Sequence, residues 1–159
     1  MNKKIKSKNA AQRAVKRLRR QKKKVVFTNG CFDVLHVGHV RYLSKAKEFG
    51  DVLIVGLNSD RSIRQLKGPG RPINRLSARA EVLAGLSSVD LIVAFNDKTP
   101  QALIRFLKPD VLVKGADYRI KEIAGAREVT ASGGRVRRVP LVKGFSTSTL
   151  IRRAKLWRK

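Results

Sequence analysis

The stretch VVFTNGCFDVLHVGHVRYLSKA, residues 25–46, places a β-branched run before a glycine-bearing turn and a segment whose apolar residues have helical spacing. The same order, a short apolar run and then an amphipathic segment, repeats from here to the end of the chain. Repeated units of this kind favour parallel strands joined by right-handed crossovers, with helices on both faces of the sheet. The sequence therefore predicts an α/β fold.

Four apolar runs and a final valine-containing run after paired glycines are candidates for the strands of this sheet. They are KVVFTNG (24–30), DVLIVGLNS (51–59), DLIVAFN (90–96), DVLVKG (110–115) and RVRRVPLV (135–142). Each is bounded by turn residues and is followed, directly or after a loop, by a segment with helical periodicity. We therefore expect a single Rossmann-like domain of three layers, with a five-stranded parallel sheet and a basic helix before it.

Charge divides the chain into two parts. There are 37 Lys and Arg residues against 11 Asp and Glu residues, which gives a net charge of +26. Residues 1–24 hold twelve of the basic residues and no acidic one. Four apolar residues recur there at helical spacing, namely Ala11, Ala14, Val15 and Leu18. We therefore expect a basic leader or helix over 1–24 and a separate folded domain over 25–159.

The basic leader has one main alternative to a solvated helix face. A charge run attracts phosphate backbones without reading their sequence, so an RNA-binding arm is a rival interpretation. Aromatic residues make up only 6% of the chain, which provides no stacking platform for single-stranded nucleic acid. Nucleic-acid binding through the leader is therefore an alternative that the sequence does not favour.

The rest of the composition favours a cytoplasmic protein. The single cysteine, Cys31, excludes a disulfide framework and a zinc site made of paired cysteines, which fits a reducing compartment. Apolar runs such as VLIV, residues 52–55, are far shorter than the roughly 20 residues that span a bilayer. No window resembles a signal peptide, so we expect no membrane partner.

Irregular segments follow four of the predicted strands. They are TNGCFD (28–33), NSDRSIRQLKGPGRPINR (58–75), KGADY (114–118) and VKGFSTS (142–148). In open α/β sheets, ligands bind beyond the carboxyl ends of the strands, where the strand order reverses. The sequence therefore predicts one binding site at this edge of the sheet.

Three familiar chemistries do not fit these segments. A nicotinamide dinucleotide site requires a glycine fingerprint, but Gly30 and Gly38 have the wrong spacing. The segment LKGPGRP, residues 66–72, is not a Walker loop. A zinc site built on the two nearby histidines would have only Asp33 close in sequence as a third ligand.

Both histidines of the chain, His36 and His39, have a better explanation at the start of a helix. If that helix begins between Val34 and Val37, both imidazoles lie near its first turn, where unpaired amides and the helix dipole favour anions. Gly38 removes a side chain that would keep a phosphate away from the backbone. Two positioned imidazoles could stabilise a phosphoryl group in its transition state. The pattern therefore predicts phosphate chemistry without a covalent intermediate.

Two motifs at the ends of the domain resemble those of the nucleotidyltransferase superfamily. GCFDVLHVGH, residues 30–39, is similar to its H-x-G-H motif, which binds a nucleoside triphosphate at the start of the first helix. GFSTSTLIRR, residues 144–153, is similar to its Ser/Thr-rich second motif. Between them, residues 66–90 and 108–118 resemble one branch, the D-glycero-β-D-manno-heptose 1-phosphate adenylyltransferases. The resemblance covers residues 10–154.

This resemblance implies a reaction. An oxygen of a sugar 1-phosphate would attack the α-phosphorus of ATP in line, and pyrophosphate would leave. Mg²⁺ would be the cofactor, held mainly by phosphates and not by direct protein ligands. The product would be an ADP-heptose for surface glycans such as a lipopolysaccharide core, and a homodimer is expected because closed symmetric dimers are the default assembly.

Alternatives within and outside this chemistry stay open at the level of the sequence. Within it are cytidylyl transfer to a polyol phosphate and adenylyl transfer to flavin mononucleotide. Outside it is a nucleic-acid-binding module that uses the same fold and the basic leader. The enzyme is the favoured interpretation, because the two motifs carry the resemblance.

The same resemblance implies roles for the residues that match the motifs. The catalytic residues would be His36, His39 and Lys67. The nucleotide-binding residues would be Asn29, Gly30, Phe32, Gly38, Gly115, Asp117, Tyr118, Ser146 and Thr147. The residues on the acceptor side would be Asp33 and Arg79.

Overall fold

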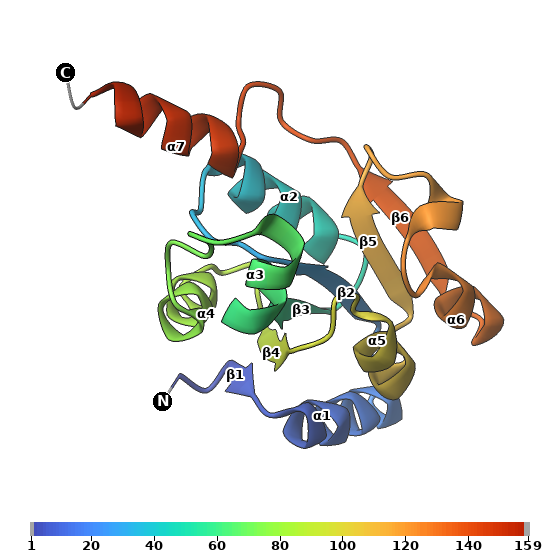
Figure 1. Ribbon diagram of the computed structural model, residues 1–159. Helices are drawn as coiled ribbons and strands as arrows, with labels where there is room; N and C mark the ends of the chain where they lie inside the picture. The colour runs from blue at the N-terminus through green and yellow to red at the C-terminus, as the bar shows by residue number, and fades with distance from the viewer. Residues whose placement is uncertain (1, 158–159) are drawn as a thin grey trace.

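A parallel sheet of six strands forms the centre of the protein (Figure 1). The structure is a computed structural model that describes residues 2–157, and its strand order is β1-β4-β3-β2-β5-β6. The strands are β1 (Ile5–Lys6), β2 (Val25–Gly30), β3 (Val52–Asn58), β4 (Leu91–Phe95), β5 (Val111–Gly115) and β6 (Arg135–Val139). The predicted α/β class and parallel sheet are confirmed, whereas the predicted number of strands, five, is wrong.

The additional strand lies inside the basic leader. The two residues of β1 pair with Ile92 and Val93 of β4, at one edge of the sheet. A strand of two residues shows no alternation of apolar and polar positions, so the sequence pattern could not reveal it. Helix α1 (Lys8–Arg20) follows, with Ser7 as its N-cap, and confirms the predicted basic helix.

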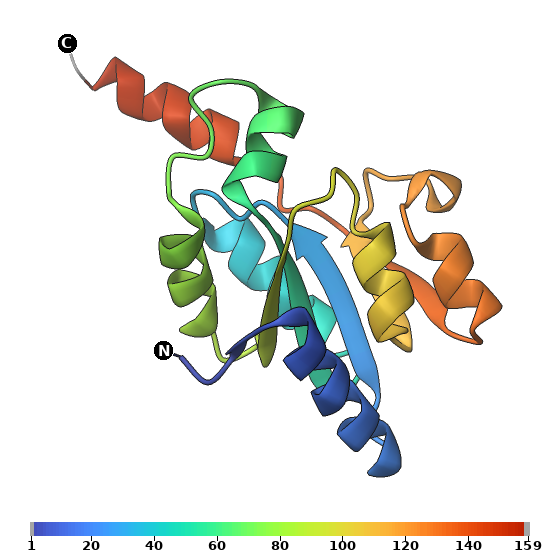
Figure 2. The same ribbon diagram turned by 60° about the horizontal axis from the view of Figure 1, so that its bottom comes forward.

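The remaining helices are distributed over both faces and the carboxyl edge of the sheet. They are α2 (Val37–Lys47), α3 (Asp60–Lys67), α4 (Leu76–Ala84), α5 (Gln101–Leu107), the short 3₁₀ helix η1 (Ile120–Glu122), α6 (Ala126–Ala131) and α7 (Thr147–Leu156). No helix within the described residues is long and apolar enough to cross a membrane. In both ribbon views α7 projects from the body of the molecule (Figures 1 and 2).

Two apolar cores separate the layers of the fold. One core lies between the sheet and helices α2 and α4, and the other lies between the sheet and helices α1, α5 and α6 (Figure 2). Strand residues alternate between the two, so that Val26 of β2 belongs to the first core and Phe27 to the second. This is the three-layer arrangement predicted from the sequence.

The basic helix α1 is packed on the sheet as part of the second core. Its Ala11 and Val15 side chains are 0% and 1% exposed. Three of its basic residues, Arg13, Lys16 and Arg17, are exposed. The charge of the leader is therefore carried on the outer face of an element whose inner face is buried.

Helix α3 occupies a segment for which the sequence predicted irregular chain. Ser59 is its N-cap, and the Ser59 hydroxyl accepts a hydrogen bond from the Ser62 backbone N–H at 3.2 Å. Asp60 in the first turn adds a favourable charge at the helix N-terminus. The capping signal was present in the sequence, but the many polar residues around it masked the short helix.

The strand order reverses between β2 and β5. After β2 the chain continues to β3 and β4 on one side, whereas β5 and β6 lie on the other side. The loops that leave the carboxyl ends of β2 and β5 therefore diverge and leave a crevice between them.

Candidate active site

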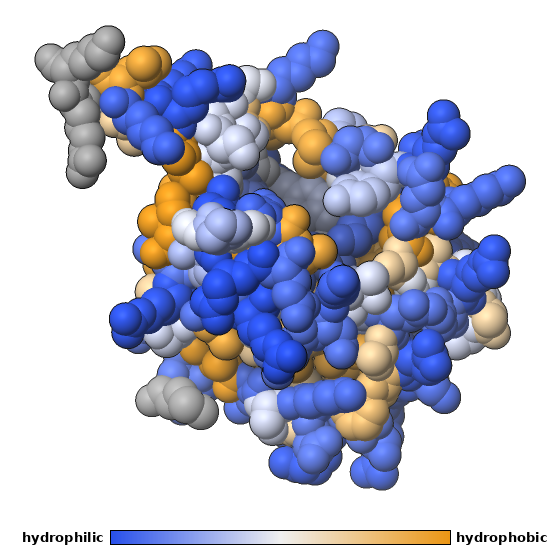
Figure 3. Space-filling view, in the orientation of Figure 1, coloured by the Kyte–Doolittle hydropathy of each residue, from blue (hydrophilic) through white to orange (hydrophobic). Residues whose placement is uncertain are grey.

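A cleft of about 710 Å³ opens at the carboxyl ends of β2 and β5. Of the residues assigned from the sequence, it is lined by Asn29, Gly30, Phe32, Asp33, His36, Gly38, His39, Lys67, Gly115, Asp117, Tyr118, Ser146 and Thr147. Arg79 is not among its lining residues. The face seen in Figure 3 is largely hydrophilic and is hollowed beside the base of α7.

The two imidazoles are stacked at the start of α2. His36 is the N-cap, His39 lies in the first turn, and their ring centroids are 3.8 Å apart at an interplanar angle of 25°. Burial lowers the pKa of His36, and it lowers the pKa of His39 to about 4, with His36 and Lys67 adding to the effect on His39. Both side chains are therefore neutral near pH 7 and serve as hydrogen-bonding groups.

Close packing fixes the positions of these rings. The edge of Phe32 meets His39, with ring centroids 5.2 Å apart at 62°. A Cβ atom at Gly30 would lie 2.9 Å from the Phe32 ring, and one at Gly38 would lie 2.9 Å from Nδ1 of His36. Gly38 was predicted to admit a phosphate, which stays a prediction; the structure shows that the absence of a side chain at Gly38 makes room for the His36 imidazole. The Nδ1 atoms of both histidines are buried without a partner in the described part of the chain.

The start of α7 is tied to the loop that leads into α2. The Ser146 hydroxyl accepts a hydrogen bond from the Thr149 backbone N–H at 3.0 Å and so caps α7. The Thr147 hydroxyl donates to the carbonyl of Val34 at 3.2 Å. Both hydroxyls therefore shape the backbone, and two helix N-termini with unpaired amides border the same cleft.

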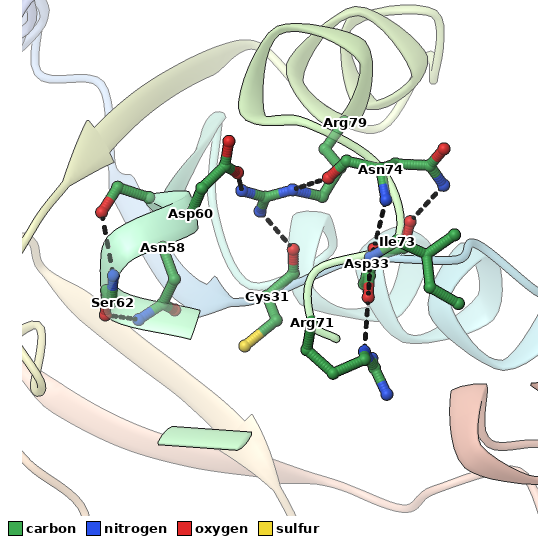
Figure 4. A network of polar contacts seen from close by, with 10 residues as sticks. Cys31, Asp33, Asn58, Asp60, Ser62, Arg71, Ile73, Asn74 and Arg79 are labelled. Carbon is green, nitrogen blue, oxygen red and sulfur yellow. Dashed lines mark hydrogen bonds and ion pairs between the residues drawn. The ribbon is translucent and has the colours of Figure 1, made fainter. Parts of the chain in front are cut away.

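Arg79 lies behind the wall of the cleft, in a network of polar contacts (Figure 4). It is 2% exposed. Its guanidinium donates to the Asp60 carboxylate at 2.7 Å, to the Cys31 carbonyl at 2.6 Å and to the Asn74 carbonyl at 2.9 Å. The sequence placed Arg79 against the acceptor, whereas in the structure this side chain joins three segments of the wall.

The carboxylate of Asp33 belongs to the same network. It accepts hydrogen bonds from Nε of Arg71 at 2.7 Å and from the backbone N–H groups of Ile73 at 2.8 Å and Asn74 at 2.9 Å. Burial alone would raise the pKa of Asp33, but these donors bring the pKa below its ordinary value. Asp33 is therefore an ionised group that orders the segment before α4 at the border of the cleft.

Other predicted residues retain free polar groups in the cleft. Lys67 ends α3 and has no carboxylate partner among the described residues. The Oδ1 atom of Asn29 is buried without a partner in that part of the chain. The Asp117 carboxylate folds over Gly115, where a Cβ atom would overlap it, and Tyr118 is 47% exposed.

The cleft also contains residues that the sequence reasoning did not assign. They include Cys31, Tyr42, Asn58, Lys98, Lys114 and Phe145. The Tyr42 hydroxyl bonds to the Thr28 hydroxyl at 2.8 Å and donates to the Val113 carbonyl at 3.1 Å, which fixes α2 against β2 and β5. A signal for Lys114 was available, because it is a charged residue at the carboxyl end of an otherwise apolar strand.

The donor groups of the cleft suit phosphate better than a divalent cation. They are imidazoles, hydroxyls, lysine ammonium groups and helix N-terminal amides. Within residues 2–157, no three His, Cys, Asp or Glu side chains are grouped so that they could hold a metal ion. Hard cations prefer carboxylate, carbonyl and phosphate oxygens. A Mg²⁺ ion carried by the phosphates of a nucleotide fits this set of donors.

The fold and the site together are those of a nucleotidyltransferase. A Rossmann-like sheet carries the H-x-G-H histidines at the start of α2, which joins β2 to β3, and the N-terminus of α7 borders the same cleft. Residues 27–154 match the Cytidylyltransferase-like family, and the chain belongs to this family.

Individual relatives refine this placement. The chain is 56% identical over 150 residues to the bifunctional protein HldE of Campylobacter curvus, an alignment that covers 94% of this chain and 31% of that protein. The bifunctional protein HldE of Vibrio parahaemolyticus is 54% identical over 145 residues, which cover 91% of this chain and 30% of that protein. The chain thus spans about a third of the length of the curated relatives it matches.

A solved structure supports the fold. The crystal structure of the lipopolysaccharide core biosynthesis protein from Thermoplasma volcanium aligns with a TM-score of 0.62 at 26% identity, and the alignment covers 77% of this chain and 99% of that chain.

Proposed function

We propose that this chain transfers the adenylyl group of ATP to D-glycero-β-D-manno-heptose 1-phosphate, giving ADP-heptose and pyrophosphate. The observation that carries the proposal is the stacked pair of His36 and His39 at the start of α2, in a cleft that is also bordered by the start of α7. The resemblance of residues 66–90 and 108–118 to the heptose branch supports the acceptor. The Thermoplasma neighbour, described as a lipopolysaccharide core biosynthesis protein, supports a product that serves surface glycans.

The neutral imidazoles would act by donating hydrogen bonds to the triphosphate. The amides at the start of α2 would add the positive end of the helix dipole. As negative charge grows on the phosphoryl oxygens and on the leaving pyrophosphate, these fixed donors would bind more strongly than in the ground state. Lys67 would add a full positive charge at the border of the cleft. The acceptor oxygen attacks in line, so that no covalent enzyme intermediate is required.

Mg²⁺ would accompany ATP as the cofactor and would be held by phosphate oxygens. When bound, it would neutralise charge on the phosphates that leave as pyrophosphate. The protein would contribute the positions of the two substrates and the hydrogen-bond donors around them.

Pyrophosphate release by the purified protein with Mg²⁺ tests the proposal. ATP and CTP are each combined with heptose 1-phosphate, glycerol 3-phosphate and flavin mononucleotide. We expect release with ATP and heptose 1-phosphate and little with the other five pairs. Release with a different pair would keep the nucleotidyl transfer and change its substrate, and absence of release with every pair would refute the enzyme proposal for this chain.

We further propose that the protein is a cytoplasmic homodimer. A closed symmetric dimer is the commonest assembly of soluble proteins, and the free thiol of Cys31 suits a reducing compartment. Sedimentation equilibrium measures the mass of the assembly, and cell fractionation measures the compartment. A monomer at micromolar concentration would refute the dimer.

A further inference from the structure

Lys114 is a half-buried lysine that lines the cleft and has no role in the proposed reaction. It is the fourth residue of β5, and the three residues before it in this strand are buried and apolar. Its side chain lines the cleft beside those of Asp117 and Tyr118. The Lys114 ammonium nitrogen lies 5.5 Å from the centre of the Tyr118 ring.

The ammonium group of Lys114 has no ion-pair partner among residues 2–157. Burial lowers the pKa of Lys114 to about 8, although Cys31 and Asp117 act in the opposite direction. A partly desolvated cation without a carboxylate in contact is uncommon, because water or an anion must replace the lost solvation. A bound anionic ligand would therefore stabilise the Lys114 ammonium group, because no carboxylate of the described residues contacts it.

The Lys114 side chain lies on the face of the sheet opposite the histidines, because side chains alternate along β5. Val113 belongs to the core beneath α2, whereas Leu112 belongs to the core beneath α1, α5 and α6. Side chains alternate along a strand, so Lys114 projects toward the same face as Leu112. It therefore enters the cleft from the face opposite α2, whose N-terminus carries His36 and His39.

We propose that Lys114 binds the phosphate group of the acceptor, opposite the histidines that hold the triphosphate. This inference rests on the proposed function, in which two anionic substrates must meet in one cleft. The start of α2 offers its amides and imidazoles to the nucleotide, and the positive charge of Lys67 acts on His39 there. Lys114 supplies a second positive charge from the other face of the sheet and shields the repulsion between the two phosphates.

Substitution of Lys114 by Met tests the inference, because Met keeps the length of the side chain and removes its charge. Initial rates of pyrophosphate release give kcat and separate KM values for ATP and for heptose 1-phosphate. We expect the KM for heptose 1-phosphate to rise on the order of 10- to 100-fold, as for loss of a charge-assisted hydrogen bond, and the KM for ATP to change less than about twofold. Lys114→Arg should recover part of the loss, and Lys16→Met on the exposed face of α1 is the matched control.

Several outcomes would overturn the inference. A rise in the KM for ATP alone would assign Lys114 to the nucleotide, and unchanged KM values for both substrates would remove it from substrate binding. Calorimetric titration of heptose 1-phosphate into the wild type and Lys114→Met separates this inference from the proposed function. Binding that depends on Lys114 without any turnover would refute the transfer reaction and keep the anion site, whereas equal binding by both proteins would refute the role of Lys114. Thermal unfolding of each variant checks that the fold is retained.

Discussion

Two sets of ionisable side chains lie at the same edge of the sheet and differ in one respect. In the paired set, Arg79 contacts Asp60 and Arg71 contacts Asp33, each at 2.7 Å. In the unpaired set, made of His36, His39, Lys67 and Lys114, no side chain has a carboxylate partner among the described residues. The paired set builds the walls of the cleft, and the unpaired set faces its interior.

The difference shows how a very basic chain can separate the ionisable groups that build the cleft wall from those that face its interior. A buried charge is tolerated when a partner and further hydrogen bonds replace its solvation, as they do for Arg79. Charges without such a partner are costly to bury and are found where a ligand completes them. Pairing within the chain therefore distinguishes the two roles better than the residue type or its position in a motif.

The largest effect is expected from His39→Ala in the unpaired set. Loss of a positioned donor to the transition state should lower kcat on the order of 10²- to 10⁴-fold. The melting temperature should change little by comparison, because no ion pair is removed. Steady-state pyrophosphate release and thermal unfolding give the two quantities, and full turnover in this variant would contradict the assigned role.

A large effect on stability, and only a small one on turnover, is expected from Arg79→Met in the paired set. The change leaves Asp60 and two carbonyl groups without their donor, so the free energy of unfolding should fall by about 3 kcal/mol. Turnover of the folded fraction should fall much less than in His39→Ala. Urea denaturation measures the difference. Arg105→Met is the control. The exposed ion pair of Arg105 with Glu128, at 3.7 Å, should contribute only about 0–1 kcal/mol to the free energy of unfolding. Equal losses of unfolding free energy in Arg79→Met and Arg105→Met would contradict the comparison.

A moderate effect is expected when the pH is lowered, because His39 and Asp33 titrate in different pH ranges. The pKa of His39 is about 4 in the folded protein, below the ordinary histidine value of 6.5. The unfolded chain therefore takes up this proton first, and stability is lost as the pH falls from 6.5 toward 4. Asp33 also has a lowered pKa, so its contribution is present above pH 3.8 and is lost only at lower pH.

Melting temperatures between pH 7.5 and 4.5 test this order. The wild type should lose more of its melting temperature over this range than His39→Gln, by roughly 5–10 degrees. An equal loss in the two proteins would show that His39 keeps an ordinary pKa when the chain folds.

The smallest effect is expected from Lys67→Met, and it is measured as a change in the pKa of His39. The positive charge of Lys67 is one of the causes that lower the pKa of His39. Its removal should therefore raise the pKa of His39, which an NMR titration of the imidazole protons measures. Lys16→Met, on α1, should leave this pKa unchanged, and a downward shift in Lys67→Met would contradict the electrostatic account.

The fold could be predicted where the sequence carries a long apolar run. The strands β2 to β5 are such runs, and each is recognisable from its β-branched residues and the turn that follows. β6 has the sequence RVRRV and was recognisable instead from its position after the paired glycines of residues 133–134. β1 escaped prediction because two residues have no periodicity, and α3 escaped because its apolar residues are few. β6 ends at Val139, earlier than predicted, since Pro140 has no N–H to donate to the ladder.

The site could be predicted where a short motif fixes both residue type and backbone position. The histidines and Gly38 are of this kind, because a helix start holds all three together. Arg79 shows the limit of prediction from a motif. Its match to a motif position on α4 does not say whether the side chain enters the cleft or forms an ion pair behind the cleft wall. Lys114 shows the converse: its place at the carboxyl end of an apolar strand can be read from the sequence, but its lack of a carboxylate partner among the described residues can be seen only in the structure.

The two-residue strand β1 also bears on the solubility of the protein. It covers the outer edge of β4, whose N–H and C=O groups would otherwise be free to pair with the sheet of another molecule. Lys3, Lys4 and Lys6 lie in or beside this short strand, and a brief edge strand rich in lysine resists such edge-to-edge pairing. A chain shortened by its first 20 residues would expose both β4 and the apolar surface that Ala11 and Val15 now cover. Part of the large positive charge thus acts as protection against aggregation, independently of any substrate.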